Sequence, residues 1–96
     1  MKIEYSNRAI DDLVNISAYT RRAFGERVAA ALEAHIRKTV NRIGRHPKSA
    51  SEVKQRPGAH VVPLVRYPFT IFYRILDDRV RIQHIRSTSR RNWESE

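Results

Sequence analysis

The chain has 96 residues, of which 41% are hydrophobic and 30% charged, and it contains no cysteine. This length and composition are typical of a single folded domain spanning residues 1–96, and the lack of cysteine excludes disulfides and thiolate metal sites. The 19 Lys and Arg residues outnumber the 10 Asp and Glu residues and give a formal net charge of +9, which favours an anionic or acidic partner.

Targeting signals are missing from the sequence. No apolar run approaches the roughly 18 residues that a membrane-spanning helix needs. The first nine residues, MKIEYSNRA, lack the apolar stretch of a signal peptide. We therefore expect a cytoplasmic protein with no membrane partner.

The first half of the chain predicts a short strand followed by two helices. Residues 1–5 alternate as a strand does, and Ser6 is a suitable helix N-cap. Phe24-Gly25 interrupts the helical pattern, which resumes at about residue 26 and ends at Gly44 and Pro47. Apolar residues at helical spacing predict the buried sides of the two helices: Ala9, Leu13, Ile16 and Tyr19, widened by Ile10 and Val14, and then Val28, Leu32, Ile36, Val40 and Ile43.

The second half predicts a loop and three strands. Residues 46–59 have little periodicity, and residues 60–66 predict a strand in which Pro63 requires a bulge or an unpaired edge. Residues 69–76 are apolar on both faces, which places this strand in the centre of a sheet. Asp77-Asp78 suits a tight turn, and the shifted phase of Ile85 in the last strand predicts either a bulge or the end of strand pairing near His84.

The resulting order, β-α-α-β-β-β, indicates an α+β fold. A helical hairpin would pack on one face of a small, twisted, mainly antiparallel sheet. The opposite face would hold Arg74, with Arg66, Arg81 and His84 as further candidates. That face is therefore the candidate working surface.

Three segments resemble one family. They are the opening S-x-x-A-x-x-D-L-x-x-I formed by Ser6, Ala9, Asp12, Leu13 and Ile16, the stretch VVPLVRYPFTIFYRI at residues 61–75, and STSRR at residues 87–91. Together they resemble toxins of the RelE/ParE superfamily from bacterial type II toxin–antitoxin modules, over nearly the whole chain. The resemblance implies an acidic antitoxin encoded by an adjacent gene, which would also mediate any contact with operator DNA. It implies no cofactor and no metal.

The branches of this superfamily differ in mechanism. RelE-like members are similar to ribosome-dependent endoribonucleases, and the positions of their catalytic lysines and arginine correspond here to Val61, Pro63 and Thr70. Of the expected polar groups only Arg90 is retained, and an arginine alone cannot carry out acid–base catalysis. The resemblance therefore favours the ParE-like branch, whose members inhibit DNA gyrase without hydrolytic chemistry.

Two groups of basic residues are the candidate binding sites. Nine Lys and Arg residues against two acidic ones lie between residues 53 and 93. For the target we select Arg74, Arg81, Arg86, Arg90 and Arg91. For the antitoxin we select the basic residues of the second helix, Arg37, Lys38, Arg42 and Arg45.

Two other functions stay open at this point. The first is a ribosome-dependent mRNA endoribonuclease with an altered catalytic set of His84, Arg74 and Arg90. The second is a non-toxic basic binding module that acts through an antitoxin–DNA complex. No residue is assigned to catalysis under the gyrase hypothesis.

Overall fold

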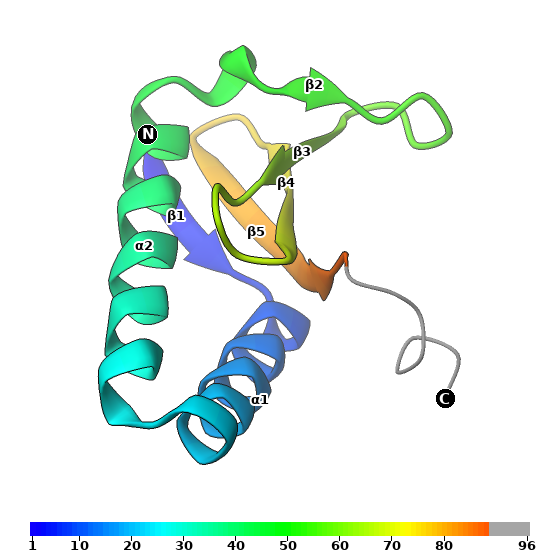
Figure 1. Cartoon of the computed structure of the whole chain (residues 1–96). Coiled ribbons are helices and arrows are strands. Elements are labelled where there is room, and N and C mark those ends of the chain that lie inside the picture. The colour runs from blue at the N-terminus through cyan, green and yellow to red at the C-terminus, as the bar shows by residue number, and fades with distance from the viewer. Residues whose placement is uncertain (89–96) are drawn as a thin grey trace.

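The computed structural model describes residues 1–88, which form two helices and a five-stranded sheet (Figure 1). The elements in chain order are β1 (Lys2–Tyr5), α1 (Asn7–Phe24), α2 (Glu26–Arg45), the 3-10 turn η1 (Pro47–Ser49), β2 (Ser51–Glu52), β3 (Ala59–Pro63), β4 (Phe69–Ile75) and β5 (Arg79–Ser87). The α+β class and the β-α-α-β-β-β order of the main elements are confirmed. Within residues 1–88, neither helix is long and apolar enough to cross a membrane.

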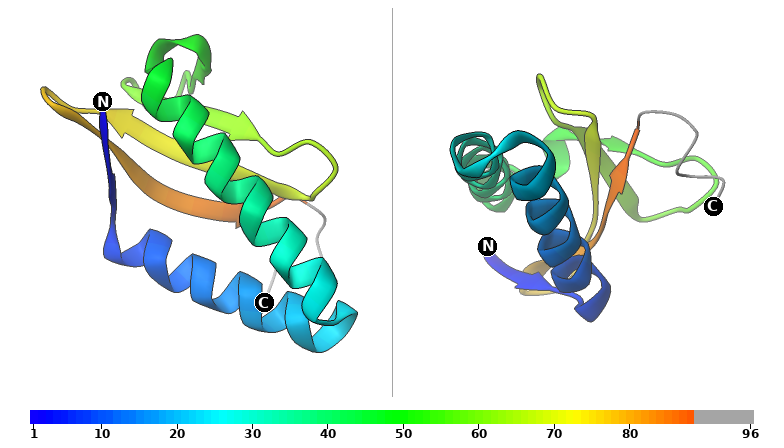
Figure 2. Two further views of the ribbon diagram at one scale, coloured as in Figure 1. Left: turned by 90° about the vertical axis from the view of Figure 1, so that its left-hand side faces the viewer. Right: turned by 60° about the horizontal axis from the view of Figure 1, so that its bottom comes forward.

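The sheet has the strand order β1-β5-β4-β3-β2, which confirms β4 as its central strand. β1 pairs with β5 in parallel, and the other neighbours are antiparallel. The two-residue strand β2 lies in the segment that was expected to be only a loop, because its composition gave no strand signal. Figure 2 shows the helices on one side of the sheet and the loop between β2 and β3 extending to the other side.

The two helices form the expected hairpin. Ser6 caps α1, since its hydroxyl oxygen accepts a hydrogen bond from the Ala9 amide at 3.0 Å. The hairpin turns at Gly25, whose φ of 96° favours glycine. Arg21 then joins the two helices by contacting Glu26 at 2.5 Å and Glu33 at 3.2 Å.

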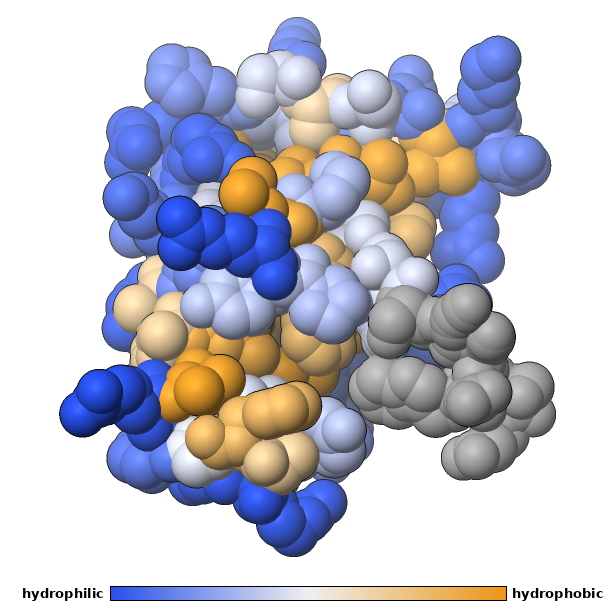
Figure 3. Space-filling view, in the orientation of Figure 1, coloured by the Kyte–Doolittle hydropathy of each residue, from blue (hydrophilic) through white to orange (hydrophobic). Residues whose placement is uncertain are grey.

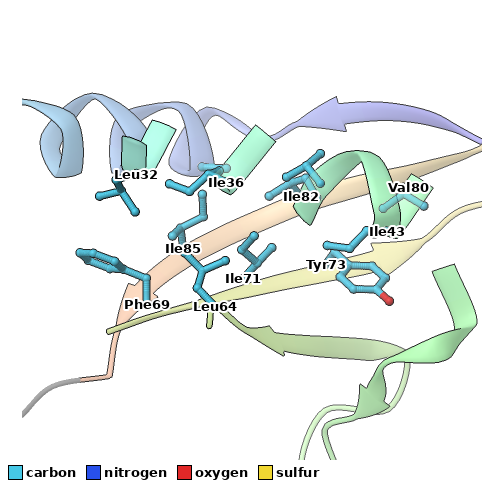
Figure 4. Close-up of a cluster of buried hydrophobic side chains, with 12 residues drawn as sticks. Leu32, Ile36, Ile43, Leu64, Phe69, Ile71, Tyr73, Val80, Ile82 and Ile85 are labelled. Carbon is cyan, nitrogen blue, oxygen red and sulfur yellow. The ribbon is translucent and has the colours of Figure 1, made fainter. Parts of the chain in front are cut away.

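The core lies between α2 and one face of the sheet. Figure 4 shows Leu32, Ile36 and Ile43 of α2 facing side chains of β4 and β5, among them Ile71, Tyr73 and Ile82. These side chains are almost fully buried. The predicted apolar side of α2 is confirmed from Leu32 to Ile43, while Val28 at its start is 40% exposed.

The prediction for the buried side of α1 was too wide. Ala9, Leu13 and Ile16 pack in or against the core, whereas Ile10 and Val14 are 47% and 61% exposed. The reason is that α1 lies along β5 and contacts the rest of the fold with a narrow stripe. Tyr19 also remains half exposed near the hairpin turn.

The last two strands are joined by the predicted turn at Asp77-Asp78, and the last strand has a bulge next to His84. The Leu76 amide donates to the Arg79 carbonyl at 2.7 Å across the Asp77-Asp78 turn. Phe72 is opposite His84 and Tyr73 is opposite Ile82, so Gln83 is an additional residue in β5. This bulge explains the phase shift of Ile85 in the sequence.

The structure also corrects the strand that was predicted at residues 60–66. The strand β3 ends at Pro63, and residues 64–68 form a loop to β4. Arg66 lies in this loop next to α2, so its placement on the opposite sheet face was wrong. The chain turns there with a φ of 78° at Arg66.

Candidate target-binding face

The sheet face that points away from α2, here called the far face, is built from three rows of cross-strand neighbours. The register across β3, β4 and β5 gives the rows Pro63–Thr70–Arg86, Val61–Phe72–His84 and Ala59–Arg74–Arg81. Because side chains alternate along a strand, these residues share one face and the core residues share the other. Of the arginines predicted to bind the target, the three that the structure describes therefore lie in two of the three rows.

Arg74 supports the loop between β2 and β3. Its Nη1 donates to the Pro57 carbonyl at 3.2 Å. A Cβ at Gly58 would lie 2.7 Å from the same nitrogen, so the guanidinium occupies space that only glycine leaves free. One side of the Arg74 guanidinium is therefore engaged by contacts within the protein.

Arg81 is part of a small ionic network at the β1–β5 border. Its Nη2 contacts the Glu4 carboxylate at 3.1 Å, and Arg79 binds the same carboxylate. The hydrogen bond from Arg79, aided by the charges of both arginines, lowers the pKa of Glu4. The positive charge of Arg81 is therefore partly compensated.

Arg86 is the exposed cation of the far face. Within residues 1–88 no hydrogen bond or ion pair engages its side chain. It lies opposite Thr70, two residues before the end of the described chain. Arg90 and Arg91, the other two target-binding candidates, lie outside the described residues, and their assignment stays a prediction.

Three positions that the sequence predicts to correspond to catalytic residues of the RelE-like branch, Val61, Pro63 and Thr70, lie on this face. Pro63 is directly opposite Thr70, and Val61 lies opposite Phe72 on the same pair of strands. None of these four side chains can exchange a proton near neutral pH. This part of the far face, here called the non-ionisable patch, is bordered by Arg86, His84 and Arg74. Among residues 1–88, no group of three or more His, Asp or Glu side chains could hold a metal ion.

A His–Asp pair borders the non-ionisable patch, since His84 lies opposite Phe72 in the middle row. Asp12 of α1 reaches β5, where its Oδ2 lies 2.9 Å from the Nδ1 of His84 and accepts the Ile85 amide at 2.9 Å. The ring of His84 also stacks on Phe72 with 5.5 Å between ring centroids. Sequence reasoning included His84 but missed Asp12 as its partner, although Asp12 is part of the first-helix signature.

The four basic residues predicted to bind the antitoxin are exposed, but they do not form one patch. Arg37 lies over α1, in a depression with Tyr5 and Leu13. Lys38 and Arg42 line depressions on the side of α2 that faces β3 and the loop 64–68. Arg45 follows Arg42 by three residues and shares its side of the helix.

The sequence of residues 3–92 matches a family profile described as the ParE toxin of the type II toxin–antitoxin system parDE. The chain belongs to the ParE toxin family. A search of curated proteins finds no significant match. The superfamily resemblance and its ParE-like branch are thereby confirmed.

Solved structures share the fold of this ParE-type toxin. The chromosomal ParDE system from P. aeruginosa superposes with a TM-score of 0.81 at 21% identity, covering 93% of this chain and 97% of the other. The isolated E. coli RelE toxin gives 0.64 at 16% identity, with 98% and 90% covered. The E. coli RelBE toxin–antitoxin complex gives 0.63 at 16% identity, with 93% and 98% covered.

Two hydrogen bonds give the family signature a structural role in this ParE-type toxin. Within residues 1–88, the edge of β5 beyond β1 has no strand beside it, and Ser6 and Asp12 form hydrogen bonds to it instead. The Ser6 hydroxyl donates to the Gln83 carbonyl at 2.8 Å, and Asp12 accepts the Ile85 amide. The signature thus fixes α1 against the sheet edge.

Proposed function

We propose that this ParE-type toxin inhibits DNA gyrase by binding it, without a hydrolytic step of its own, and that an acidic antitoxin neutralises it. The observation that carries the proposal is the non-ionisable patch of the far face. Val61, Pro63 and Thr70 adjoin there without an ionisable group between them. A ribonuclease needs a base, an acid and a cationic stabiliser around one phosphate. A binding surface needs only complementary shape and charge.

The cations of the far face support binding to an acidic or nucleic-acid surface. Arg86 is exposed, Arg81 is half-buried beside Glu4, and Arg74 keeps N–H groups that the contact to Pro57 does not use. Arginine side chains of this kind bind carboxylate and phosphate groups in pairs of hydrogen bonds. DNA gyrase bound to DNA presents both carboxylate and phosphate groups.

The antitoxin completes the proposed function. The exposed basic side chains of α2 suit an acidic segment that is disordered alone and orders on binding. The two toxin–antitoxin systems with the same fold, ParDE and RelBE, also support an antitoxin partner. Any contact of this toxin with operator DNA would then pass through the antitoxin.

One observation favours the ribonuclease alternative. Asp12 fixes one ring nitrogen of His84, which would leave Nε2 to accept a proton, as in other His–carboxylate pairs. With Arg74 and Arg90 as phosphate ligands, this pair could activate a ribose hydroxyl. However, Asp12 also has a structural role at Ile85, which explains the pair without catalysis.

Induction of the toxin alone in a bacterium separates the functions. A gyrase inhibitor should raise the DNA-damage response and produce filamentous cells while translation initially continues. A ribonuclease should stop protein synthesis within minutes and leave cleaved transcripts. Normal growth at full expression would exclude both the gyrase inhibitor and the ribonuclease. The non-toxic binding module would then be the remaining function.

Arg86→Ala tests the far face within the same assay. We expect weaker growth arrest from the folded variant, by roughly the tenfold in affinity that about 1.4 kcal/mol represents. Arg90→Ala should act in the same direction. Arg22→Ala, which removes an exposed charge at the end of α1, is the control and should leave growth arrest unchanged. Full toxicity of both the Arg86→Ala and the Arg90→Ala variant would refute the site assignment.

A further inference from the structure

The middle row of the far face holds two stacked rings, Phe72 and His84, which we call the ring pair. Their centroids are 5.5 Å apart and their planes differ by 27°. Both side chains are half-buried, so part of each ring lies open on the far face. Phe72 belongs neither to the core of residues 1–88 nor to the apolar side chains that pack against it. The fold therefore keeps an aromatic side chain on the sheet face that points away from the helices.

The ring of His84 is held in one orientation. The Oδ2 atom of Asp12 lies 2.9 Å from its Nδ1, and the same oxygen accepts the Ile85 amide, which fixes the carboxylate. The ring of Phe72 stacks on the imidazole and limits its rotation. A surface whose side chains are already ordered loses less conformational entropy when a ligand binds to it. The ring pair is thus a preorganised contact for another planar group.

Arginines flank the ring pair along the strands. Arg86 lies in the row on one side, and Arg74 and Arg81 lie in the row on the other. Same-face residues of a strand are about 7 Å apart, so the two outer rows are about 14 Å apart with the ring pair midway between them. Arg86 is exposed, and Arg74 retains N–H groups that its contact with the Pro57 carbonyl does not use. The far face thus alternates cation, ring and cation along the strands.

The loop of residues 53–58 between β2 and β3, here called the arm, extends to the far-face side of the sheet. The Arg56 amide donates to the Val53 carbonyl at 3.1 Å, which closes a turn within the arm. Lys54 and Arg56 are exposed and form no ion pair within residues 1–88. Figure 3 shows a hydrophilic surface in the upper right of the view, where Figure 1 places this loop. Because Arg74 bonds to the arm, the arm adds two cations beside that end of the far face.

The acidic side chains near the far face are engaged within the protein. Glu52 accepts a backbone amide of the arm, and Glu4 binds two arginines of β5. Asp12 accepts the amide of β5 described above. The Asp77-Asp78 turn lies beyond the outer row and limits the positive surface at that end. Positive charge therefore exceeds negative charge along the three rows and the arm.

One class of ligand matches both the cations and the rings. A single strand of nucleic acid carries a phosphate at every nucleotide and has base faces that are free to stack on aromatic side chains. The bases of a duplex are already stacked on one another, so a duplex would contact the cations and leave the ring pair without a planar partner. An acidic protein surface would do the same. An apolar peptide would contact the rings and leave the cations unpaired.

We propose that the far face binds a single strand of DNA. One base stacks on the ring pair, and phosphates lie at Arg86 on one side and at Arg74 and the arm on the other. Arginine suits these positions because its guanidinium can donate two hydrogen bonds to one phosphate. The inference deepens the proposed function and rests on it in one respect, since it assigns the far face to a strand of the DNA on which gyrase acts.

Fluorescence anisotropy of a labelled oligothymidine of about 12 nucleotides, titrated with the purified toxin, tests the site. Phe72→Leu should lower the affinity at least about fivefold, because leucine is apolar but offers no ring to a base. Phe72→Tyr keeps a ring and should stay within about twofold of the parent protein. With a duplex of the same length, Phe72→Leu should leave the affinity unchanged. An unchanged oligothymidine affinity in Phe72→Leu, or an equal loss with the duplex, would overturn the proposal.

The salt dependence of binding separates phosphate contacts from stacking. Each phosphate contact contributes about 0.7 to the slope of log affinity against log salt concentration for a single strand. Arg86→Ala should therefore reduce the slope by about 0.7 and the double variant Lys54→Ala, Arg56→Ala by about 1.4, whereas Phe72→Leu should leave it unchanged. Arg22→Ala removes an exposed charge at the end of α1 and is the matched control. Equal slopes in Arg86→Ala and this control would refute the phosphate contact.

Three further readouts locate the strand and separate this inference from the proposed function. Amide shifts induced by oligothymidine should fall on the ring pair and Arg86, and shifts confined to α2 would reject the far face. An oligouridine of the same length that binds more than about tenfold tighter would overturn the assignment to DNA. If oligothymidine binds as proposed but toxin induction raises no DNA-damage response, the proposed function fails and the DNA site stands. If the response is raised but oligothymidine does not bind, the DNA site fails and the proposed function stands.

Discussion

Replacement of Asp12 tests how α1 is held against the sheet. Its Oδ2 accepts the Ile85 amide at 2.9 Å, and Ile85 is almost fully buried. A hydrogen bond to a charged acceptor contributes about 1.5–3 kcal/mol, and a buried donor left unpaired costs a similar amount. We therefore expect Asp12→Ala to lower the free energy of unfolding by about 2–3 kcal/mol. For a domain of this size that corresponds to roughly 8–24 °C in unfolding temperature.

Two further variants separate the effect of losing the hydrogen bond to the Ile85 amide from the effect of losing the contact with His84. Asp12→Asn keeps an oxygen for the Ile85 amide and should lose only about 1 kcal/mol. In a His84→Ala background, Asp12→Ala should still cost more than about 1.5 kcal/mol, since the amide remains without an acceptor.

Urea denaturation followed by circular dichroism measures these differences, and hydrogen exchange of the Ile85 amide reports the bond directly. An Asp12→Ala variant within about 0.5 kcal/mol of the parent protein would refute the reasoning. Unchanged exchange protection at Ile85 would do the same. A loss that disappears entirely in the His84→Ala background would show that Asp12 acts through the histidine.

Two other predictions concern the sheet and its margins. Gly58→Ala should destabilise the fold by about 1–2 kcal/mol, because a Cβ displaces the Arg74 guanidinium and the φ of 90° is unfavourable; the cost measured by denaturation should be smaller in an Arg74→Ala background, and an equal cost would contradict the contact. The hydrogen bond from Arg79 lowers the folded-state pKa of Glu4 below its ordinary 4.5, so its contribution to stability is present above about pH 4.5 and is lost as the pH falls through the folded value. Stability measured from about pH 6 to pH 3 should therefore decline less steeply in Glu4→Gln, and identical profiles would exclude Glu4 as a cause.

Much of this fold was predictable because local patterns and tertiary packing agree. The alternation in residues 69–76 gave the central strand, and the change of phase at Ile85 gave the bulge at Gln83. The Ser6 cap and the break at Gly25 gave the bounds of α1. In each case the residue type that local geometry requires is also the one that packing requires.

The predictions were wrong where the burial or the partner of a residue depends on tertiary contacts and not on the local sequence. Ile10 and Val14 have the spacing of buried residues, but α1 has only a narrow contact with β5, and no local pattern reports that width. The role of Asp12 depends on an amide 73 residues away. Arg66 was placed on a strand because the glycine that normally marks such a turn is missing there.

The candidate site was predictable in part for the same reason. Strand alternation placed Arg74 on one face with Arg81 and His84 as further candidates, and the register agrees with this, whereas the alternation did not place Arg86 there. The intramolecular partners of Arg74 and Arg81 were not predictable, since Pro57 and Glu4 come from other parts of the chain.

The position of β5 has a consequence for synthesis of the toxin. This strand lies between β1 and β4, so residues 2–5 pair with residues 79–82 and the sheet joins the first strand to the last. Until β5 leaves the ribosome, β1 lacks the strand with which it pairs, and Val80, Ile82 and Ile85 are missing from the core. A nascent or prematurely terminated chain therefore cannot complete the far face. The bacterium meets a folded toxin only when translation of the domain is nearly finished, and such late, long-range pairing also slows folding. An antitoxin that is synthesised before the toxin would already be present when the toxin completes its fold.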